Sequence, residues 1–276
     1  MNEYRNQIDH SIIDIKALKL RLLGICPSDS HEFDLISDVA SYIETIYPEI
    51  LEGKIWPKLG ETMIGYKRLC NIEACLTNII NNKVEGDLIE TGVWRGGACI
   101  FMRALLEDKG ISDKKVWVAD SFEGLPIPNS ILYPDDSGDI SYTFNELSVS
   151  LDEVKNNFAN YHFLDDQVVF LKGWFKDTLP AAPIGKLSML RLDGDLYEST
   201  IDALFYLYPK LSPGGYCIID DWGAIAACRH AVEDYRKIYN ITEDIQGIDW
   251  TGVFWIKEKE SPIYSRDQFN RMILTK

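Results

Sequence analysis

Residues 90–97 read Glu90-Thr91-Gly92-Val93-Trp94-Arg95-Gly96-Gly97, and this segment decides the fold of the chain. It follows a short apolar run and opens a stretch in which apolar residues have helical spacing. Gly92 and Gly96 carry no Cβ, so the backbone can turn tightly there and approach a bound molecule closely. A strand, a glycine turn and a helix in this order predict the first unit of an α/β sheet.

On either side of this segment, short apolar runs alternate with helical patterns. The runs lie at 87–90, 116–120, 168–173, 187–193, 215–220 and 253–257, and the helical patterns at about 67–81, 97–108, 150–160, 198–209 and 226–239. The alternation predicts a doubly wound, mostly parallel sheet with helices on both faces. In such a sheet, ligands bind beyond the carboxyl ends of the strands.

Apolar residues of 6–24 and of about 33–46 recur every three or four positions, which predicts two further helices with one apolar face each. Each apolar face requires a cover, which is either the main domain or another subunit. We therefore expect a helical N-terminal appendage at residues 1–60, a main domain at 61–276, and a homo-oligomer of two or more copies.

The segment from Phe122 to Ser148 contains two closely spaced prolines and many polar residues. This composition predicts a long loop. Loops of this length within a compact domain often act as lids or binding elements, and the alternative is plain disorder. We expect residues 122–148 to be a lid.

Composition narrows the class of protein. The net charge is −15 without a basic run, which argues against nucleic acid and anionic membranes as partners. The N-terminal residues do not resemble a signal peptide, and no apolar run reaches the length of a membrane span, so we expect a cytoplasmic protein. The six cysteines form no CxxC pair, which predicts free thiols.

The glycine turn also indicates a cofactor. It lacks the G-x-G-x-x-G spacing of dinucleotide-binding proteins, which argues against NAD. The remaining E-x-G-x-x-x-G pattern is typical of S-adenosylmethionine sites. Asp120 ends the next run, thirty residues after Glu90, where an acid can accept from both ribose hydroxyls of an adenosine. The turn alone would equally fit close strand–helix packing, but the acid at the end of the second strand favours a cofactor.

Three further acids follow neighbouring predicted strands: Asp193 ends one, and Asp220 and Asp221 end the next. Carboxylates gathered at one edge repel each other unless a cation compensates, and hard oxygen ligands suit Mg²⁺. The alternative is that these acids only cap the following helices, which is how Asp195 could act before 196–199. Two acidic clusters beside an adenosine site favour the metal.

Methyl transfer from the sulfonium of S-adenosylmethionine requires an oxygen nucleophile that is aligned with the methyl carbon and loses its proton. Coordination to Mg²⁺ lowers the pKa of a hydroxyl and orients it. Asp193 and Asp195 are both candidates for the base that accepts the proton, and the sequence does not separate them.

At this point the residues resemble the macrocin O-methyltransferases, which modify deoxysugars of macrolide antibiotics. The similar stretches are 62–65, 87–97, 119–126, 173–180, 192–200 and 220–224, and they extend over about residues 60–257. The resemblance implies a Rossmann-like fold of the class I S-adenosylmethionine methyltransferases, Mg²⁺ at Asp193, Asp220 and Asp221, and closure of Thr62 and Met63 over the cofactor. It also implies that Glu90, Asp120 and Ser121 hold the amino-acid and adenosine parts of that cofactor.

The residues of these motifs are therefore our candidate cofactor site. They are Thr62, Met63, Glu90, Thr91, Gly92, Trp94, Gly96, Asp120, Ser121, Phe122, Gly173, Trp174, Phe175 and Asp193.

The expected function is transfer of a methyl group from S-adenosylmethionine to a sugar hydroxyl of a glycosylated natural product, macrolide-like or related. Two alternatives stay open. A catechol-like phenol would chelate Mg²⁺ through adjacent oxygens in the same way. A non-catalytic adenosine-binding module would bind the cofactor without depending on a metal.

Overall fold

The computed structural model describes residues 13–25 and 38–274 and contains a seven-stranded sheet in the order β3-β2-β1-β4-β5-β7-β6. The strands are β1 (Asp87–Thr91), β2 (Val116–Asp120), β3 (Val168–Lys172), β4 (Leu187–Leu192), β5 (Leu211–Ile219), β6 (Gln246–Gly247) and β7 (Val253–Ile256). β1 to β5 are parallel, and β7 pairs antiparallel with β5 and β6. The predicted mostly parallel sheet is confirmed. The sequence did not predict β6, whose two residues are too few to show a periodicity.

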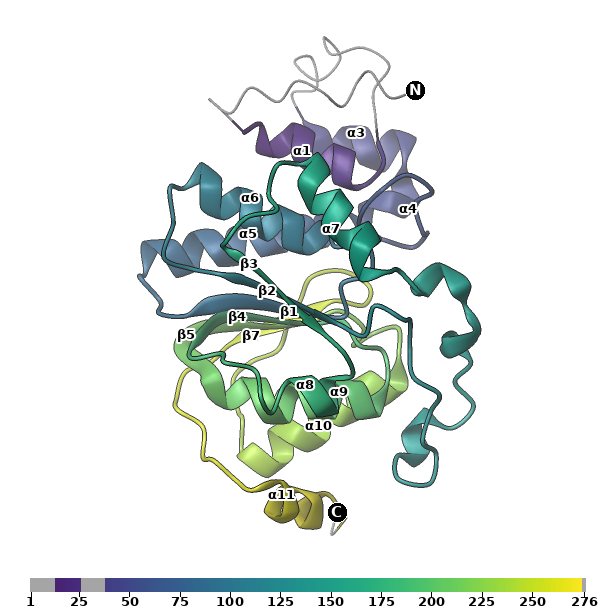
Figure 1. The fold of residues 1–276 in the computed structure, drawn as a ribbon, viewed down its shortest axis with the longest axis vertical. Helices are drawn as coiled ribbons and strands as arrows, with labels where there is room; N and C mark the ends of the chain where they lie inside the picture. Colours follow the sequence, from purple (N-terminus) through teal and green to yellow (C-terminus); the bar gives the residue numbers. More distant parts are fainter. Residues whose placement is uncertain (1–12, 26–37, 275–276) are drawn as a thin grey trace.

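Helices cover both faces of the sheet (Figure 1). One face carries α5 (Gly65–Asn81), α6 (Gly97–Asp108) and α7 (Leu151–Asn160), and the other carries α8 (Phe175–Thr178), α9 (Tyr197–Leu207) and α10 (Ala226–Tyr239). Beyond α10 lies α11 (Arg266–Leu274), which the sequence analysis did not predict. The chain passes from β1 to β2 and β3 on one side and to β4 and β5 on the other, so connections diverge beside β1. That position is where a doubly wound sheet binds ligands.

The described N-terminal part forms α1 (Ile15–Leu22), α3 (Val39–Ile46) and α4 (Pro48–Leu51), outside the layer of α5 and α6 (Figure 1). Asp14 begins α1 by accepting from the backbone N–H groups of Lys16 and Ala17. Leu20 and Leu22 are fully buried in the core cluster that α5 and α6 share. The main domain itself therefore covers the apolar face of α1. The parts of the predicted helices at 6–12 and 33–37 lie outside the described residues, and the domain division near residue 60 stays a prediction.

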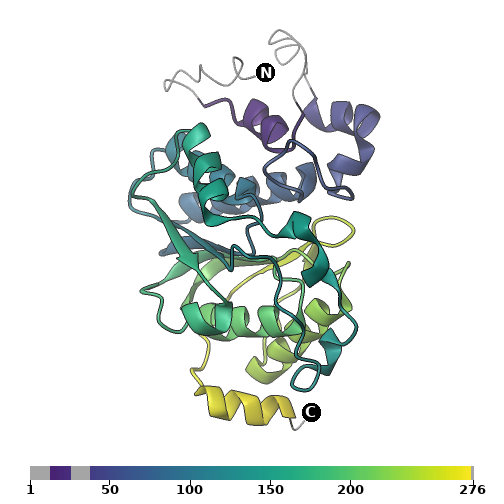
Figure 2. The ribbon, with the colours of Figure 1, turned by 45° about the vertical axis from the view of Figure 1, so that its right-hand side comes forward.

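The predicted loop at 122–148 runs along one side of the molecule, from the layer of α7 to that of α10 (Figures 1 and 2). It contains three 3₁₀ turns: η1 (Pro134–Asp136), η2 (Ser141–Thr143) and η3 (Asn145–Leu147). Its action as a lid stays a prediction. Within 13–25 and 38–274, no helix is long and apolar enough to cross a membrane. The described cysteines are free: Cys70, Cys75, Cys99, Cys217 and Cys228.

Candidate active site

The glycine turn after β1 brings the ends of β1 and β4 into contact. Gly92 has a φ of +82°, and a Cβ added there would lie 1.7 Å from the backbone oxygen of Asp193. The N–H of Asp193 donates to the carbonyl of Thr91 at 2.9 Å, so the two strand ends are joined directly beside this contact. A side chain at position 92 would displace the segment that carries the acidic cluster.

We therefore expect Gly92→Ala to unfold at a markedly lower urea concentration than the wild type. The left-handed backbone alone costs about 1–3 kcal/mol for alanine, and the contact with Asp193 adds to this. Gly110→Ala is the matched control, because Gly110 also has a positive φ, +65°, but a Cβ there would meet nothing within 4 Å. Equal midpoints for the two variants in chemical denaturation would contradict the close approach at Gly92.

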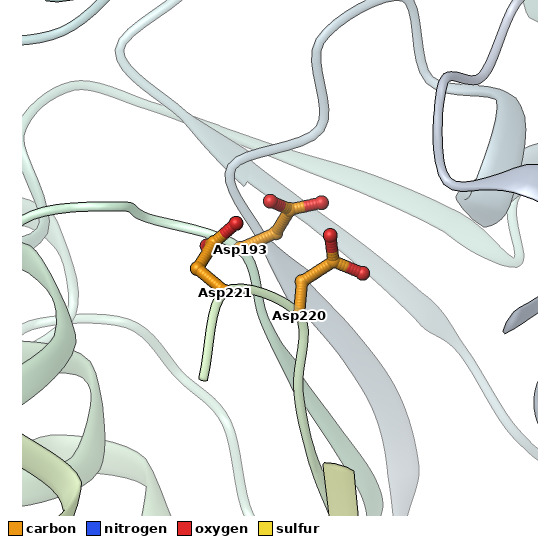
Figure 3. A group of neighbouring side chains, drawn as sticks. All are labelled: Asp193, Asp220 and Asp221. Atoms are coloured by element: carbon orange, nitrogen blue, oxygen red, sulfur yellow. The ribbon is translucent and has the colours of Figure 1, made fainter. Parts of the chain in front are cut away.

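Three carboxylates meet at the carboxyl ends of β4 and β5 (Figure 3). One potential ligand oxygen from each of Asp193, Asp220 and Asp221 lies within 4.8 Å of the others, and the three side chains face one another. Asp220 and Asp221 are buried, and Asp193 is half-buried. Three hard oxygen donors at this spacing fit a divalent cation such as Mg²⁺.

Two buried arginines, which the sequence analysis did not assign, compensate part of this negative charge. Arg191 in β4 contacts Glu90 and Asp220 and lies 2.8 Å from Asp193. Arg68 in α5 contacts Asp220 and lies 2.9 Å from Asp249. The signal in the sequence was a single arginine within the apolar run 187–193, because an arginine in a buried strand requires an acidic partner.

Asp221 differs from the other two carboxylates because no ion pair with an arginine is found for it among the described residues. Its Oδ2 accepts from the N–H of Asp195 at 3.3 Å. Burial raises the pKa of Asp221 well above its ordinary value, and the charges of Asp195 and Asp193 add to this. The pKa of Asp193 is raised for the same first reason, burial, with Asp220 adding to it and Arg191 opposing it. Burial and mutual repulsion thus disfavour the ionised forms of these carboxyl groups, and a cation bound among them would favour those forms.

The structure does not support the alternative interpretation of Asp195 as the cap of the following helix. The first turn of α9 is capped by Asp136, whose carboxylate accepts from the N–H groups of Tyr197 and Glu198 at 2.6 and 3.1 Å. Asp195 has a left-handed φ of +57° and lines the cleft beside the acidic cluster. Burial, with the charge of Asp220, raises the pKa of Asp195 to about 6. The capping interpretation of Asp195 is therefore wrong, because the left-handed turn leaves the cap to another segment.

Asp120 ends β2 at the same edge of the sheet. Its carboxylate accepts from the backbone N–H groups of Val93 and Phe122, at 2.7 Å each. These two bonds fix the turn after β1 relative to β2 and direct the carboxylate along the lining of the cleft. A ribose bound here could donate its hydroxyls to the Asp120 carboxylate, whose orientation these two bonds already fix.

The cleft has a volume of about 360 Å³. The predicted cofactor residues that line it are Thr62, Met63, Glu90, Gly92, Trp94, Asp120, Ser121, Gly173, Trp174, Phe175 and Asp193. Three others do not line it: Thr91 is buried in β1, Gly96 lies beneath Val154 of α7, and Phe122 packs against Phe170. These three residues pack beneath the residues that line the cleft and do not face it.

An aromatic rim, which the sequence analysis missed, lies at the mouth of the cleft and consists of Trp56, Phe144 and Trp250. The rings of Trp56 and Phe144 are 6.1 Å apart and edge-on, and Trp250 donates to the carbonyl of Glu52 at 2.8 Å. All three are at least 40% exposed despite their size. They come from three segments far apart in the sequence, so no local pattern indicated them.

Comparison with known proteins gives a consistent result. The model of the family "Macrocin-O-methyltransferase (TylF)" matches residues 44–257. The chain is 54% identical, over 75% of its length and 79% of the relative's, to the 8-demethyl-8-(2,3-dimethoxy-alpha-L-rhamnosyl)-tetracenomycin-C 4'-O-methyltransferase of Streptomyces olivaceus. It is 53% identical, over 74% of its length and 78% of the relative's, to the demethyldecarbamoylnovobiocin O-methyltransferase of Streptomyces niveus. The solved structure of the O-methyltransferase NovP has a TM-score of 0.80 and 45% identity, covering 89% of this chain and 98% of that one.

Proposed function

This chain belongs to the macrocin O-methyltransferase family, and we propose that it transfers a methyl group from S-adenosylmethionine to a sugar hydroxyl of a glycosylated natural product. The observation that carries the proposal is the position of Asp193, Asp220 and Asp221, which lie together at the edge of the sheet beside the glycine turn. This arrangement joins a cofactor pocket to a site for an oxygen nucleophile.

The cofactor half of the cleft lies between the ends of β1 and β2. In our proposal, Asp120 accepts from the ribose hydroxyls, and Thr62 and Met63 cover the cofactor from the segment before α5. The N–H of Gly97 donates to the carbonyl of Glu61 at 2.9 Å, which holds that segment against the glycine turn. Contacts within the protein therefore hold both Asp120 and the segment of Thr62 and Met63 where they would bind and cover the cofactor.

We expect Asp120→Ala to bind S-adenosylhomocysteine about tenfold or more weakly, because the ribose hydroxyls lose a charged acceptor. Asp120→Asn, which keeps one acceptor oxygen, should lose less. Calorimetry with and without Mg²⁺ checks this, and the loss should be the same in both conditions. Unchanged affinity of Asp120→Ala would remove Asp120 from the cofactor site.

The acidic half of the cleft receives the acceptor in our proposal. Asp193, Asp220 and Asp221 would hold Mg²⁺, which lowers the pKa of a coordinated hydroxyl when bound. Asp195 is then the base that takes the hydroxyl proton. It lines the same cleft but lies outside the three-carboxylate set and outside the ion pairs of Arg191, whereas Asp193 belongs to both. Asp195 would take the proton of the acceptor hydroxyl, and bound S-adenosylmethionine would supply the methyl group to that oxygen and leave as S-adenosylhomocysteine.

The cleft favours an acceptor without phosphate groups. Among its described lining residues the basic ones are Arg68 and Lys176, and both are paired, Arg68 with Asp220 and Lys176 with Glu198 at 3.3 Å. Apart from the proposed Mg²⁺, a nucleotide diphosphate would meet carboxylates and no unpaired basic side chain among these lining residues. The exposed aromatic rim instead offers apolar surface for the non-sugar part of a glycoside.

Mass spectrometry of a panel incubated with S-adenosylmethionine and Mg²⁺ tests the proposal. The panel contains glycosides with apolar aglycones, including demethyldecarbamoylnovobiocin, together with a catechol and a nucleotide diphosphate sugar. We expect the mass increase of one methyl group on a glycoside only. Methylation of the catechol alone would establish the phenol alternative, and cofactor binding without any methylation would favour a binding module.

A further inference from the structure

The first turn of α9 takes its cap from the loop at 122–148. Leu196 precedes the helix and has no side chain that can accept, so the first N–H groups depend on a distant residue. Asp136 supplies both acceptor oxygens, to Tyr197 and Glu198, across 61 and 62 residues of sequence. The cap therefore joins the loop to the helix that follows the acidic turn.

This helix end is part of the active site. Asp195 lies directly before it in a left-handed conformation, with the N–H of Leu196 donating to the carbonyl of Gly194 at 2.6 Å. Glu198 and Ser199 of the first turn line the cleft, and a Cβ on Gly194 would lie 3.1 Å from the Cβ of Ser199. Movement of the first turn of α9 would therefore move the carboxylate of Asp195.

Asp136 is held firmly in this position. It is 1% exposed, although it carries a carboxylate. Burial raises the pKa of Asp136, and the two backbone N–H donors at the positive end of the helix oppose part of this effect. Neighbouring residues add contacts, because Asp135 lies 2.6 Å from Nδ1 of His230 in α10 and the rings of Tyr133 and Tyr197 are 5.9 Å apart.

The same loop continues over the cleft. Ser141, Phe144 and Leu147, five to eleven residues after Asp136, belong to its lining. The carbonyl of Glu146 accepts from the indole of Trp94 at 2.8 Å, which fixes the far end of the loop at the glycine turn. Asp136 thus connects the part of the loop that lines the cleft to α9, the helix that follows Asp195.

We propose that Asp136 is a positioning residue for methyl transfer: it fixes the first turn of α9, and through that turn it sets the place of the Asp195 carboxylate. This inference rests on the proposed role of Asp195 as the base. Asp136 does not line the cleft and acts through the backbone of Tyr197 and Glu198.

The test compares the kinetics of Asp136→Ala and Asp136→Asn on the panel glycoside that the wild type methylates. Misplacement of a catalytic group by about 1 Å can cost on the order of 100-fold in rate. We expect kcat of Asp136→Ala to fall about 10- to 100-fold, with the affinity for S-adenosylhomocysteine within about twofold of the wild type. Asp136→Asn keeps one of the two acceptor oxygens that bind Tyr197 and Glu198, so its kcat should lie between those of Asp136→Ala and the wild type.

Asp14→Ala is the matched control. Asp14 likewise accepts from two backbone N–H groups, at 2.9 and 3.0 Å, but it caps α1 on the far side of α5 and α6. It should lower thermal stability and leave kcat unchanged. A kcat of Asp136→Ala within twofold of Asp14→Ala would overturn the inference, as would an equal loss in Asp136→Asn. If Asp136→Ala does not fold, the kcat of Asp136→Asn is compared with those of the wild type and of Asp14→Ala instead. A kcat of Asp136→Asn equal to these two values overturns the proposal. Failure of the proposed function itself would show separately, as a wild type that methylates no glycoside.

Discussion

Removal of divalent metal by EDTA is expected to stop methyl transfer and leave S-adenosylhomocysteine binding largely intact. The acceptor hydroxyl would lose the cation that lowers its pKa and orients it, whereas the proposed ribose acceptor, Asp120, is not one of the three carboxylates. Rate assays before and after addition of excess Mg²⁺ check this, and Mg²⁺ should restore the rate. Full turnover of metal-stripped enzyme in EDTA would rule out a metal-assisted mechanism even if methyl transfer itself is observed.

Among the proposed ligands, Asp221 offers the clearest substitution. Asp220 also holds Arg68 and Arg191, and Asp193 holds Arg191, so their substitution disturbs buried ion pairs as well. Asp221→Asn removes one negative charge without breaking an arginine contact. Its rate at low Mg²⁺ should therefore fall strongly and recover in part at high Mg²⁺, because the defect is one of metal affinity. Loss of activity that no metal concentration relieves would argue that Asp221 has another role.

Asp195→Asn is expected to lower kcat by about 10²- to 10⁴-fold, the range that a general base contributes. The asparagine keeps the size of the side chain but cannot accept the hydroxyl proton. The KM for the acceptor and the Mg²⁺ concentration for half-maximal activity should change little, since the three-carboxylate set is intact. Steady-state kinetics with varied acceptor and varied Mg²⁺ separate these quantities.

Asp87→Asn is the control for this substitution. Asp87 begins β1 at the opposite edge of the sheet, where its carboxylate accepts from Lys115 N–H and from the indole of Trp117, at 2.9 Å each. It should lose stability but keep kcat. A kcat of Asp195→Asn within threefold of Asp87→Asn would exclude Asp195 as the base and return the role to Asp193.

Local patterns were sufficient to predict most of the sheet. Five of the six predicted apolar runs end at a glycine or an acid, and α6 and α10 begin and end at the predicted residues. The meeting of Asp193 with Asp220 and Asp221 also followed from sequence, because parallel neighbouring strands have their carboxyl ends at one edge. The unpredicted strands and α-helices are the two-residue β6, the four-residue α4 and α8, and the outlying α11. The first three are too short for any periodicity to appear.

The sequence by itself therefore determined the order of strands and helices along the chain, the glycine turn and the acids at the carboxyl edge. Each of these features depends on residue spacing within one element. Only the tertiary structure decided which charges meet. Arg68 and Asp220 are 152 residues apart, and Asp136 caps a helix 61 residues further along the chain. Such pairs form because buried charges and unpaired N–H groups require partners from whichever segment the packing brings near, and sequence spacing carries no record of that choice.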